Sequence, residues 1–158
     1  MKDAPVALFT MEGSVYASLE IECFDEKRDA RTYSGTSPVI AHPPCQLWGK
    51  MAIVNFSRWG GEHNRPGNDG GCFAFAKAAV DRCGGVLEHP AQSYAWPAHG
   101  LHKPVQGKWS KSGIGWVCEV WQSAYGHRAN KKTWLYYVGD NPPIPVRTET
   151  PSGSHQIG

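Results

Sequence analysis

Two short motifs place reactive side chains directly after apolar segments of the chain. A His-Pro-Pro-Cys sequence at residues 42–45 follows the apolar run 39–41, and a Glu-His-Pro sequence occupies residues 88–90. Consecutive prolines fix their own φ angles and hold the preceding residue extended, so the chain must turn rigidly before Cys45. An ionised thiol is a nucleophile, and a carboxyl group such as that of Glu88 can bind or protonate a substrate.

These residues also have purely structural interpretations. A free cysteine at a strand end is commonly a small buried apolar side chain, and a glutamate there is commonly a cap or turn residue. The spacing of the histidines matches no zinc module, so we expect no metal site. Trp48, Trp59 and Trp96 could stack on a base, or fill a core or an interface.

The elements that must position the two motifs alternate between strands and helices. Apolar residues at helical spacing predict a helix over residues 72–83, ended by two glycines, and a β-prone run predicts a strand over 132–138. In chain order, the expected elements are strand 6–9, turn 10–14, helical turn 15–19, strand 21–24, a charged helix 25–33 with an Asp N-cap, strand 39–41, surface loop 55–71, helix 72–83, strand 86–87 leading into 88–90, loop 91–112 and strands 116–121 and 132–138.

This order predicts an α/β fold with parallel strands, because parallel neighbours need crossover connections that are usually helices. Ligands of such sheets collect at the carboxyl ends of the strands. Both proline-containing motifs follow a predicted strand, so we expect residues 42–45 and 88–90 to lie on the same rim of the sheet.

Composition limits the class of protein. A chain of 158 residues is long enough for one domain with a sizeable core. Its formal net charge of +2 permits nucleic-acid binding without demanding it. Five cysteines without CxxC spacing fit a reducing compartment, and the first residues lack an apolar segment long enough for a signal peptide or a membrane span. We therefore expect a soluble, cytoplasmic protein with no membrane partner.

Three motifs occur in the order found in the DNA cytosine 5-methyltransferases, which the chain resembles. Residues 43–46, Pro-Pro-Cys-Gln, match the catalytic loop of that family, and residues 88–90 resemble its Glu-Asn-Val or Glu-Asn-Pro element. Residues 123–139 are similar to a later stretch that runs from Ala-x-x-Tyr-Gly through basic residues to an apolar strand ending Val-Gly. The resemblance spans residues 6–139 and implies a Rossmann-like three-layer fold with a mostly parallel sheet, reduced to a methyltransferase-like core. Residues 140–158 form a proline-rich tail that we expect to be partly disordered.

The resemblance implies chemistry on a pyrimidine base of DNA. The Cys45 thiolate would add to carbon 6 of the ring, Glu88 would orient the ring, and Arg128 would lie near the base and phosphate. The base would be flipped out of a duplex or taken from a single strand. The implied substrate-binding residues are Pro44, Gln46, Trp48, His89, Lys131 and Lys132. The implied methyl donor is S-adenosylmethionine, held by Phe9, Gly13, Asp25 and Pro43.

The sequence also departs from the family. The Phe-x-Gly-x-Gly loop that approaches the methyl donor keeps only Phe9 and Gly13, and no counterpart of the target-recognition region follows Gly139. Small phage and prophage proteins with this truncated pattern look similar from end to end, which fits the cytoplasm of a bacterium or a phage-infected cell. Two alternatives stay open: an inactive methyltransferase-like protein that binds nucleic acid or a host protein, and an enzyme that modifies a free pyrimidine nucleotide. A homodimer could supply the missing recognition surface.

Overall fold

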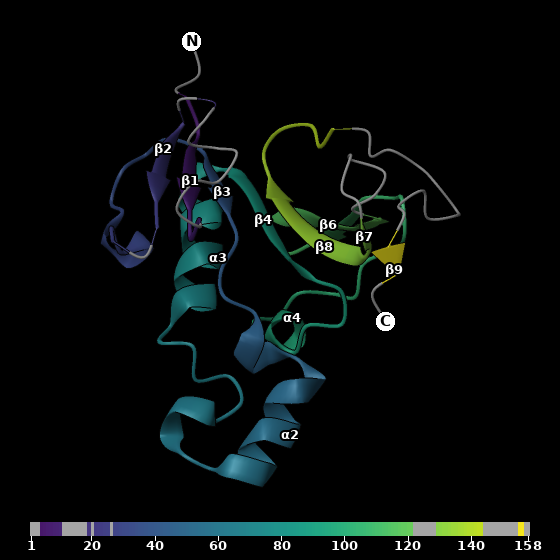
Figure 1. Ribbon diagram of the computed structural model, residues 1–158. Helices are drawn as coiled ribbons and strands as arrows, with labels where there is room; N and C mark the ends of the chain where they lie inside the picture. The colour runs from purple at the N-terminus through teal and green to yellow at the C-terminus, as the bar shows by residue number, and fades with distance from the viewer. Residues whose placement is uncertain are drawn as a thin grey trace.

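The computed structural model describes residues 4–10, 19, 21–25, 27–121, 129–143 and 155–156. Within them, seven strands form one mixed sheet in the order β2-β1-β3-β4-β8-β6-β5 (Figure 1). The strands of this sheet are β1 (Val6–Leu8), β2 (Glu22–Phe24), β3 (Val39–Ala41), β4 (Gly85–Pro90), β5 (Ser110–Ser112), β6 (Gly115–Trp121) and β8 (Lys132–Val138). Two further short strands, β7 (Ala129–Asn130) and β9 (His155–Gln156), pair with each other.

The described helical segments are few and short. They are the 3-10 turns η1 (Ala30–Thr32), η2 (Gln46–Trp48) and η3 (Glu62–Asn64), and the α-helices α2 (Lys50–Trp59), α3 (Cys72–Cys83) and α4 (Ala95–Ala98). Helix α3 has the predicted bounds and packs against β3, β4 and β8. Within the described residues, no helix has both the length and the apolar character needed to cross a bilayer.

The α/β class is confirmed, but the expectation of a mostly parallel sheet is wrong. Strands β2, β1, β3 and β4 are parallel neighbours, whereas β8 is antiparallel to both β4 and β6, and β5 is antiparallel to β6. The antiparallel pairs carry more of the paired residues. Only residues 122–131 separate β6 from β8, too few for the dozen or more residues that a parallel crossover needs.

The hydrophobic core lies between the sheet and one layer of helices. Phe73, Ala76 and Val80 of α3 are fully buried, as their helical spacing predicts, against Leu87 of β4 and Tyr136 of β8. Helix α4 packs on the same side, because its Trp96 ring lies 5.5 Å from that of Trp134 in β8. The sheet thus rests on α3 and α4 through one face.

A glycine allows β4 to begin beside β3. Gly85 has φ of +118°, and a Cβ atom there would lie 2.0 Å from the carbonyl oxygen of Val39. No side chain fits such a distance, so only glycine lets the two parallel strands pair at this end. The two glycines that were predicted to end α3 therefore also determine where β4 begins.

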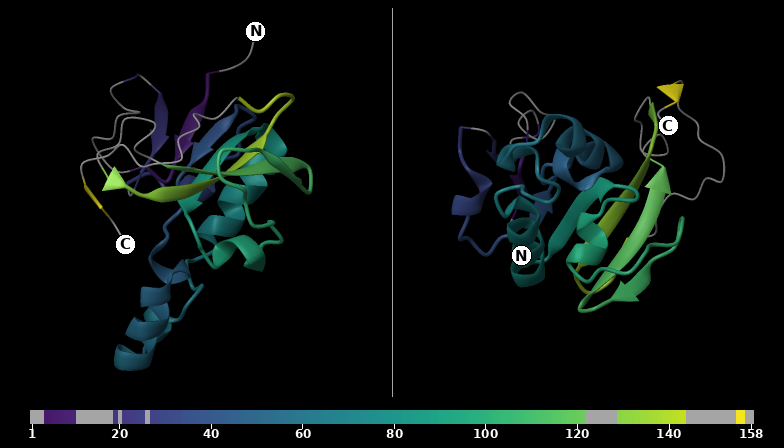
Figure 2. Two further views of the ribbon diagram at one scale, coloured as in Figure 1. Left: turned by 90° about the vertical axis from the view of Figure 1, so that its right-hand side faces the viewer. Right: turned by 90° about the horizontal axis from the view of Figure 1, so that it is seen from below.

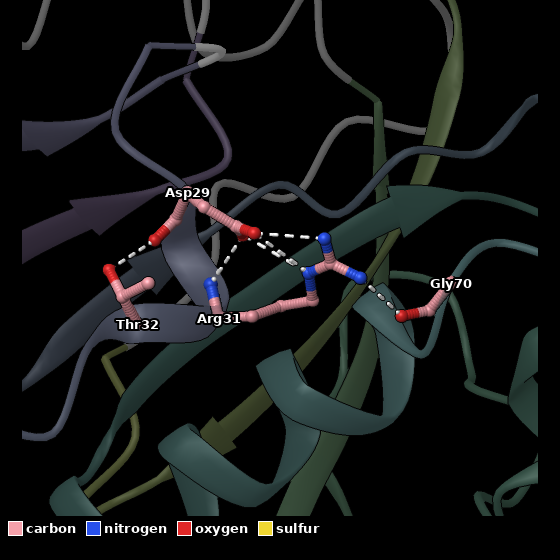
Figure 3. Close-up of polar contacts among 4 residues, drawn as sticks. All are labelled: Asp29, Arg31, Thr32 and Gly70. Atoms are coloured by element: carbon pink, nitrogen blue, oxygen red, sulfur yellow. Dashed lines mark hydrogen bonds and ion pairs between the residues drawn. The ribbon is translucent and has the colours of Figure 1, made fainter.

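The predicted charged helix over residues 25–33 is wrong except for its last turn, η1. Asp25 accepts hydrogen bonds from the backbone N–H groups of Lys27 and Arg28, and Asp29 accepts one from Arg31. Each aspartate therefore closes its own local turn, which competes with a continuous helix. Figure 3 shows that the Arg31 side chain also pairs with Asp29 and donates to the carbonyl of Gly70, fixing this turn to the loop before α3.

The predicted surface loop over residues 55–71 begins later than expected. Helix α2 continues to Trp59 and ends at Gly60, which has φ of +64°, and the turn η3 follows. Figures 1 and 2 show α2 projecting from the body of the protein, beyond the carboxyl ends of the parallel strands. The loop predicted for residues 91–112 contains the short elements α4 and β5, and β4 runs on through the motif at 88–90.

Two other predictions fall largely outside the described residues. These are the turn and helical turn at 10–19, and the tail after residue 139. Of the tail, residues 140–143 and 155–156 are described. The indole N–H of Trp109 donates to the carbonyl of Pro143 at 2.6 Å, so the first residues of the tail contact the domain.

Candidate functional site

The two motifs lie side by side at the carboxyl edge of the parallel strands. His42 directly follows β3, and its Nδ1 atom lies 3.1 Å from Oε2 of Glu88 in β4. The next residue of β4, His89, has its Nε2 atom 3.3 Å from the carbonyl oxygen of Pro44. Two hydrogen bonds therefore join segments that lie more than forty residues apart in the chain.

His89 is fully buried and connects the second motif to the first. Its ring packs edge-on against Phe73, with 5.0 Å between ring centroids, and its Nδ1 lies 2.6 Å from the hydroxyl oxygen of Ser93. That oxygen also accepts the backbone N–H of Ala95, so we assign the Ser93 proton to His89 Nδ1 and the ring proton to Nε2, which donates to Pro44. This burial favours a supporting role for His89 over the predicted contact with a substrate.

The environment of His89 favours the uncharged ring. Burial lowers its pKa below the usual range, although the hydrogen bond to Pro44 and the charge of Glu88 act in the opposite direction. A neutral imidazole can donate from one nitrogen and accept at the other, as this arrangement requires.

Glu88 is held as a carboxylate. Burial by itself raises its pKa, but hydrogen bonds from His42 and Thr133 and the positive charge of Lys131 outweigh this effect, so the pKa lies below its usual range. The Thr133 hydroxyl of β8 donates to Oε1, and also reaches the carbonyl of His89 at 3.0 Å. An ionised Glu88 accepts hydrogen bonds and does not donate them.

Cys45 is exposed and its turn is fixed by the backbone. It stands at the N-cap position of η2, directly after the two prolines. The N–H of Gly67 donates to the carbonyl of Leu47 at 2.7 Å, and the N–H of Tyr94 donates to that of Trp48 at 2.8 Å. Both sides of η2 are therefore anchored, which agrees with the expectation that the cysteine is held rigidly.

The side chain of Trp48 strengthens this anchoring. Its indole N–H donates to Asp69 at 2.9 Å, and its ring packs near Phe73 and, edge-on, His99. Gly67 has φ of +83°, and a Cβ there would lie 3.2 Å from the Trp48 ring. A side chain here would press against the ring and would need a positive φ that residues other than glycine rarely adopt. Trp48 therefore lines the cleft next to Cys45 and is only partly exposed.

Cys45 opens onto a cleft of about 570 Å³, within the size range of small-molecule sites. The cleft is lined by residues of segments 45–51 and 90–93, by Trp121 and by two lysines, Lys131 and Lys132. With Lys50, these lysines give the cleft three cations, and no acidic residue is found among the described residues that line it. Cys45, Gln46, Trp48 and the two adjacent lysines are therefore brought together as predicted.

One of the lysines is held in place at the edge of the cleft. The Lys132 ammonium lies 3.7 Å from the nearly buried carboxylate of Glu119 and 5.0 Å from the centre of the Trp121 ring. Trp134 donates to the other oxygen of Glu119 at 2.8 Å. Glu88, by contrast, is not among the residues that line the cleft. It lies in β4 two residues before Pro90, which does line it.

The residues predicted to hold a methyl donor gather at a different place on the same edge. Phe9, Asp25 and Pro43 follow the ends of β1, β2 and β3, and the strand order reverses direction between β2 and β3 across β1. Ligands of open α/β sheets bind at such a switch point. Asp25 is partly exposed there, Pro43 is buried, and Phe9 has φ of +61°. The structure thus places these three residues at the ends of neighbouring strands.

Some predicted residues cannot be placed, and some contacts were not predicted. Gly13 and Arg128 lie outside the described residues. Lys50, Trp121 and Thr133 belong to the site without having been expected there. The position of Lys50 five residues after Cys45 could have indicated that it belongs to the site. Trp121 and Thr133 are brought to the site only by the register of β6 and β8.

Across the described part of the chain, no group of three or more His, Cys, Asp or Glu side chains is arranged to hold a metal ion. The groups of the cleft that could do chemistry are the thiol of Cys45 and the ammonium groups of Lys50, Lys131 and Lys132. Comparison of the chain with known protein families, with curated proteins and with solved structures gives no match.

Proposed function

We propose that this protein is a nucleobase-directed enzyme of the DNA cytosine 5-methyltransferase type, with Cys45 as its nucleophile and Glu88 as the group that orients the ring. The observation that carries the proposal is the junction of the two motifs. An exposed thiol faces a cationic cleft, and the turn that holds it is hydrogen-bonded to the strand that carries Glu88. A Rossmann-like arrangement around the β1/β3 switch point belongs to the same proposal.

Each residue has a defined task in the reaction. The Cys45 thiolate forms a bond to carbon 6 as the C5–C6 double bond of the ring breaks, and the electron pair moves into the ring. The ionised Glu88 accepts a hydrogen bond from the exocyclic amino group and so selects cytosine. Once that electron pair has formed a bond from carbon 5 to the methyl group of the donor, loss of the C5 proton to solvent and cleavage of the Sγ–C6 bond would restore the double bond and release the thiolate.

The donor site would be formed by Phe9, Asp25 and Pro43 at the strand ends. S-adenosylmethionine, when bound, would supply the methyl group that is transferred to carbon 5. Asp25 offers a carboxylate for the ribose hydroxyls, and Pro43 restricts the chain between this site and the cleft.

Covalent trapping tests this proposal. DNA that contains 5-fluorocytosine cannot lose a proton from carbon 5, so after methyl transfer the bond to the cysteine persists. We expect a stable protein–DNA adduct in the presence of S-adenosylmethionine, seen by denaturing electrophoresis and intact mass, and its absence in Cys45→Ala. Cys72→Ala is the matched control, because that thiol does not line the cleft and burial raises its pKa. No adduct in several sequence contexts would count against the enzyme.

The size of the cleft supports a second candidate, an enzyme that modifies a free pyrimidine nucleotide. A volume of about 570 Å³ suits a single nucleotide, and a free nucleotide needs no recognition domain. Activity on a mononucleotide with none on DNA would favour this candidate. Calorimetry separates both enzymes from an inactive binding protein, which would bind DNA or a host protein without binding S-adenosylmethionine.

A further inference from the structure

Two aromatic rings on the outer face of the sheet, away from α3, hold the first residues of the tail. Side chains alternate along a strand, and Tyr136 packs in the core with α3, so Tyr137 points to the opposite face of β8. The ring of Trp109, which directly precedes β5, lies 5.8 Å from the Tyr137 ring at an interplanar angle of 53°. Both side chains are partly exposed. We call Trp109 and Tyr137 the aromatic pair.

The tail crosses the aromatic pair directly after β8. An added Cβ atom at Gly139 would overlap the Tyr137 ring, so any other residue there would displace the ring from its place beside the tail. The Tyr137 hydroxyl donates to the carbonyl of Asn141 at 3.3 Å, and the Trp109 indole N–H donates to that of Pro143 at 2.6 Å. Each ring of the pair therefore binds one tail carbonyl, and the two carbonyls lie two residues apart.

The bound segment is rich in proline. Residues 142–145 read Pro-Pro-Ile-Pro. A proline ring fixes φ and removes the backbone N–H, so consecutive prolines favour the polyproline II helix, in which no carbonyl is used by an internal hydrogen bond. Such a segment presents acceptors and apolar rings. A surface that binds it must offer hydrogen-bond donors on apolar rings, and the indole N–H of tryptophan and the hydroxyl of tyrosine are such donors.

Two observations favour the tail of the same chain as the ligand. Pro142 is partly buried although Asn141 and Pro143 on either side of it are exposed, so Pro142 is the residue that lies against the protein. The later residues 155–156 form β9, which pairs with β7 of the same chain. The proline segment is therefore tied to the domain on both sides, which raises its effective concentration at the aromatic pair.

We propose that Trp109 and Tyr137 form a binding site for a polyproline II segment, and that Asn141–Pro143 of the same chain occupy it. The two ring donors bind the carbonyls of the segment, and the Pro142 ring lies on the aromatic surface. A proline-rich peptide added from outside has the same chemistry and competes with the tail. Neither residue of the aromatic pair lines the cleft, so this inference goes beyond the proposed function and does not depend on it.

The test follows the indole N–H signal of Trp109 by NMR in the nitrogen-labelled full chain, with Trp109→Phe to identify the signal. Pro142→Gly with Pro143→Gly removes the proline rings of the internal ligand and should shift this signal. The probe is a peptide with the sequence of residues 140–147. We expect it to return the signal of this variant toward the wild-type position in a saturable manner.

The wild type should bind the same peptide less tightly. If the tail occupies the site for at least about nine-tenths of the time, the apparent Kd of the peptide is at least about tenfold higher in the wild type than in the glycine variant. Adding Tyr137→Phe to the glycine variant removes one of the two donors, and should weaken peptide binding by about 2- to 12-fold. Melting curves verify that each variant is folded.

Tyr94→Phe in the glycine variant is the matched control, because Tyr94 is exposed and lies outside the aromatic pair, so peptide affinity should not change. An unchanged Trp109 signal in the glycine variant would overturn the inference. Equal binding of a peptide whose prolines are replaced by alanine would do the same, as would equal affinity of the proline peptide for the wild type and the glycine variant. A wild-type Trp109 signal that changes as dimers form with rising protein concentration would assign the site to a second copy and reject the tail of the same chain.

Discussion

His89 makes the stability of the fold depend on pH in a defined window. The ring is buried and uncharged in the folded protein, where burial lowers its pKa below the ordinary value of 6.5. In the unfolded chain, the ring takes up a proton as the pH falls below about 6.5. The unfolded state then binds more protons than the folded state, so the free energy of unfolding decreases as the pH falls.

The size of the effect follows from one proton. Between the ordinary pKa of the unfolded chain and the lower pKa of the folded protein, the free energy of unfolding should fall by up to about 1.4 kcal/mol per pH unit. Above pH 7 both states carry a neutral ring and His89 contributes no slope. Protonation of Nδ1 below this window also removes the hydrogen bond that this nitrogen accepts from Ser93.

Urea unfolding followed by tryptophan fluorescence at pH values from 8 to 5 measures this dependence. His89→Gln loses packing and is less stable throughout, but its curve should be flatter than that of the wild type between pH 6.5 and 5. His102→Gln is the control, because His102 is exposed and its removal should leave the slope unchanged. Equal slopes in His89→Gln and the wild type would refute the assignment of His89 as a buried neutral ring.

Three further predictions concern Glu88, the loop at Gly67 and the exposure of Cys45. Glu88→Gln should cost about 1 to 3 kcal/mol, because the hydrogen bonds of His42 and Thr133 to a charged acceptor are lost. Since the folded pKa of Glu88 is lowered, this cost, measured by urea unfolding, should be present above about pH 4.5 and shrink as the pH falls further, and a cost that grows in acid would contradict it. Gly67→Ala should destabilise by about 1 to 2 kcal/mol or more in thermal unfolding, from the positive φ and the contact with Trp48, and a neutral effect would refute the tight packing of that loop. Iodoacetamide should alkylate the exposed Cys45 well before the buried Cys118, as peptide mass mapping would show, and the reverse order would exclude an accessible nucleophile.

Much of the fold could be predicted where local patterns decide it. The apolar run at β3, the helical period of α3 and the β-prone run of β8 have the predicted bounds or nearly so. Helix α2 was not predicted, and its second half was assigned to a loop, because residues 55–59 are mostly polar and the helix depends on packing of Ala52 and Phe56. The antiparallel direction of β8 relative to β6 was also not predicted, because it depends on the short connection between these two strands.

The candidate site could be predicted in part for the same reason. The rigid turn of Cys45 follows from its two prolines, and the contact between the two motifs, through His42 and Pro44, follows from strands that end at the same edge. The inward direction of His89 was not predicted, because one residue of shift along β4 turns a side chain to the other face of the sheet. Trp121 and Thr133 depend on the pairing of β6 and β8, which no local pattern specifies.

Hydrogen exchange at carbon 5 of cytosine tests the central claim most directly, because it requires the thiol and not the methyl donor. Addition of the Cys45 thiolate to carbon 6 allows a deuteron from D₂O to bind carbon 5, and elimination then releases the original proton. Mass spectrometry of cytosine recovered from DNA after incubation should show deuterium at carbon 5 with the wild-type protein and none with Cys45→Ala. Absence of exchange with the wild type, on single-stranded DNA, duplex DNA and free nucleotides alike, would contradict a nucleophilic role for Cys45.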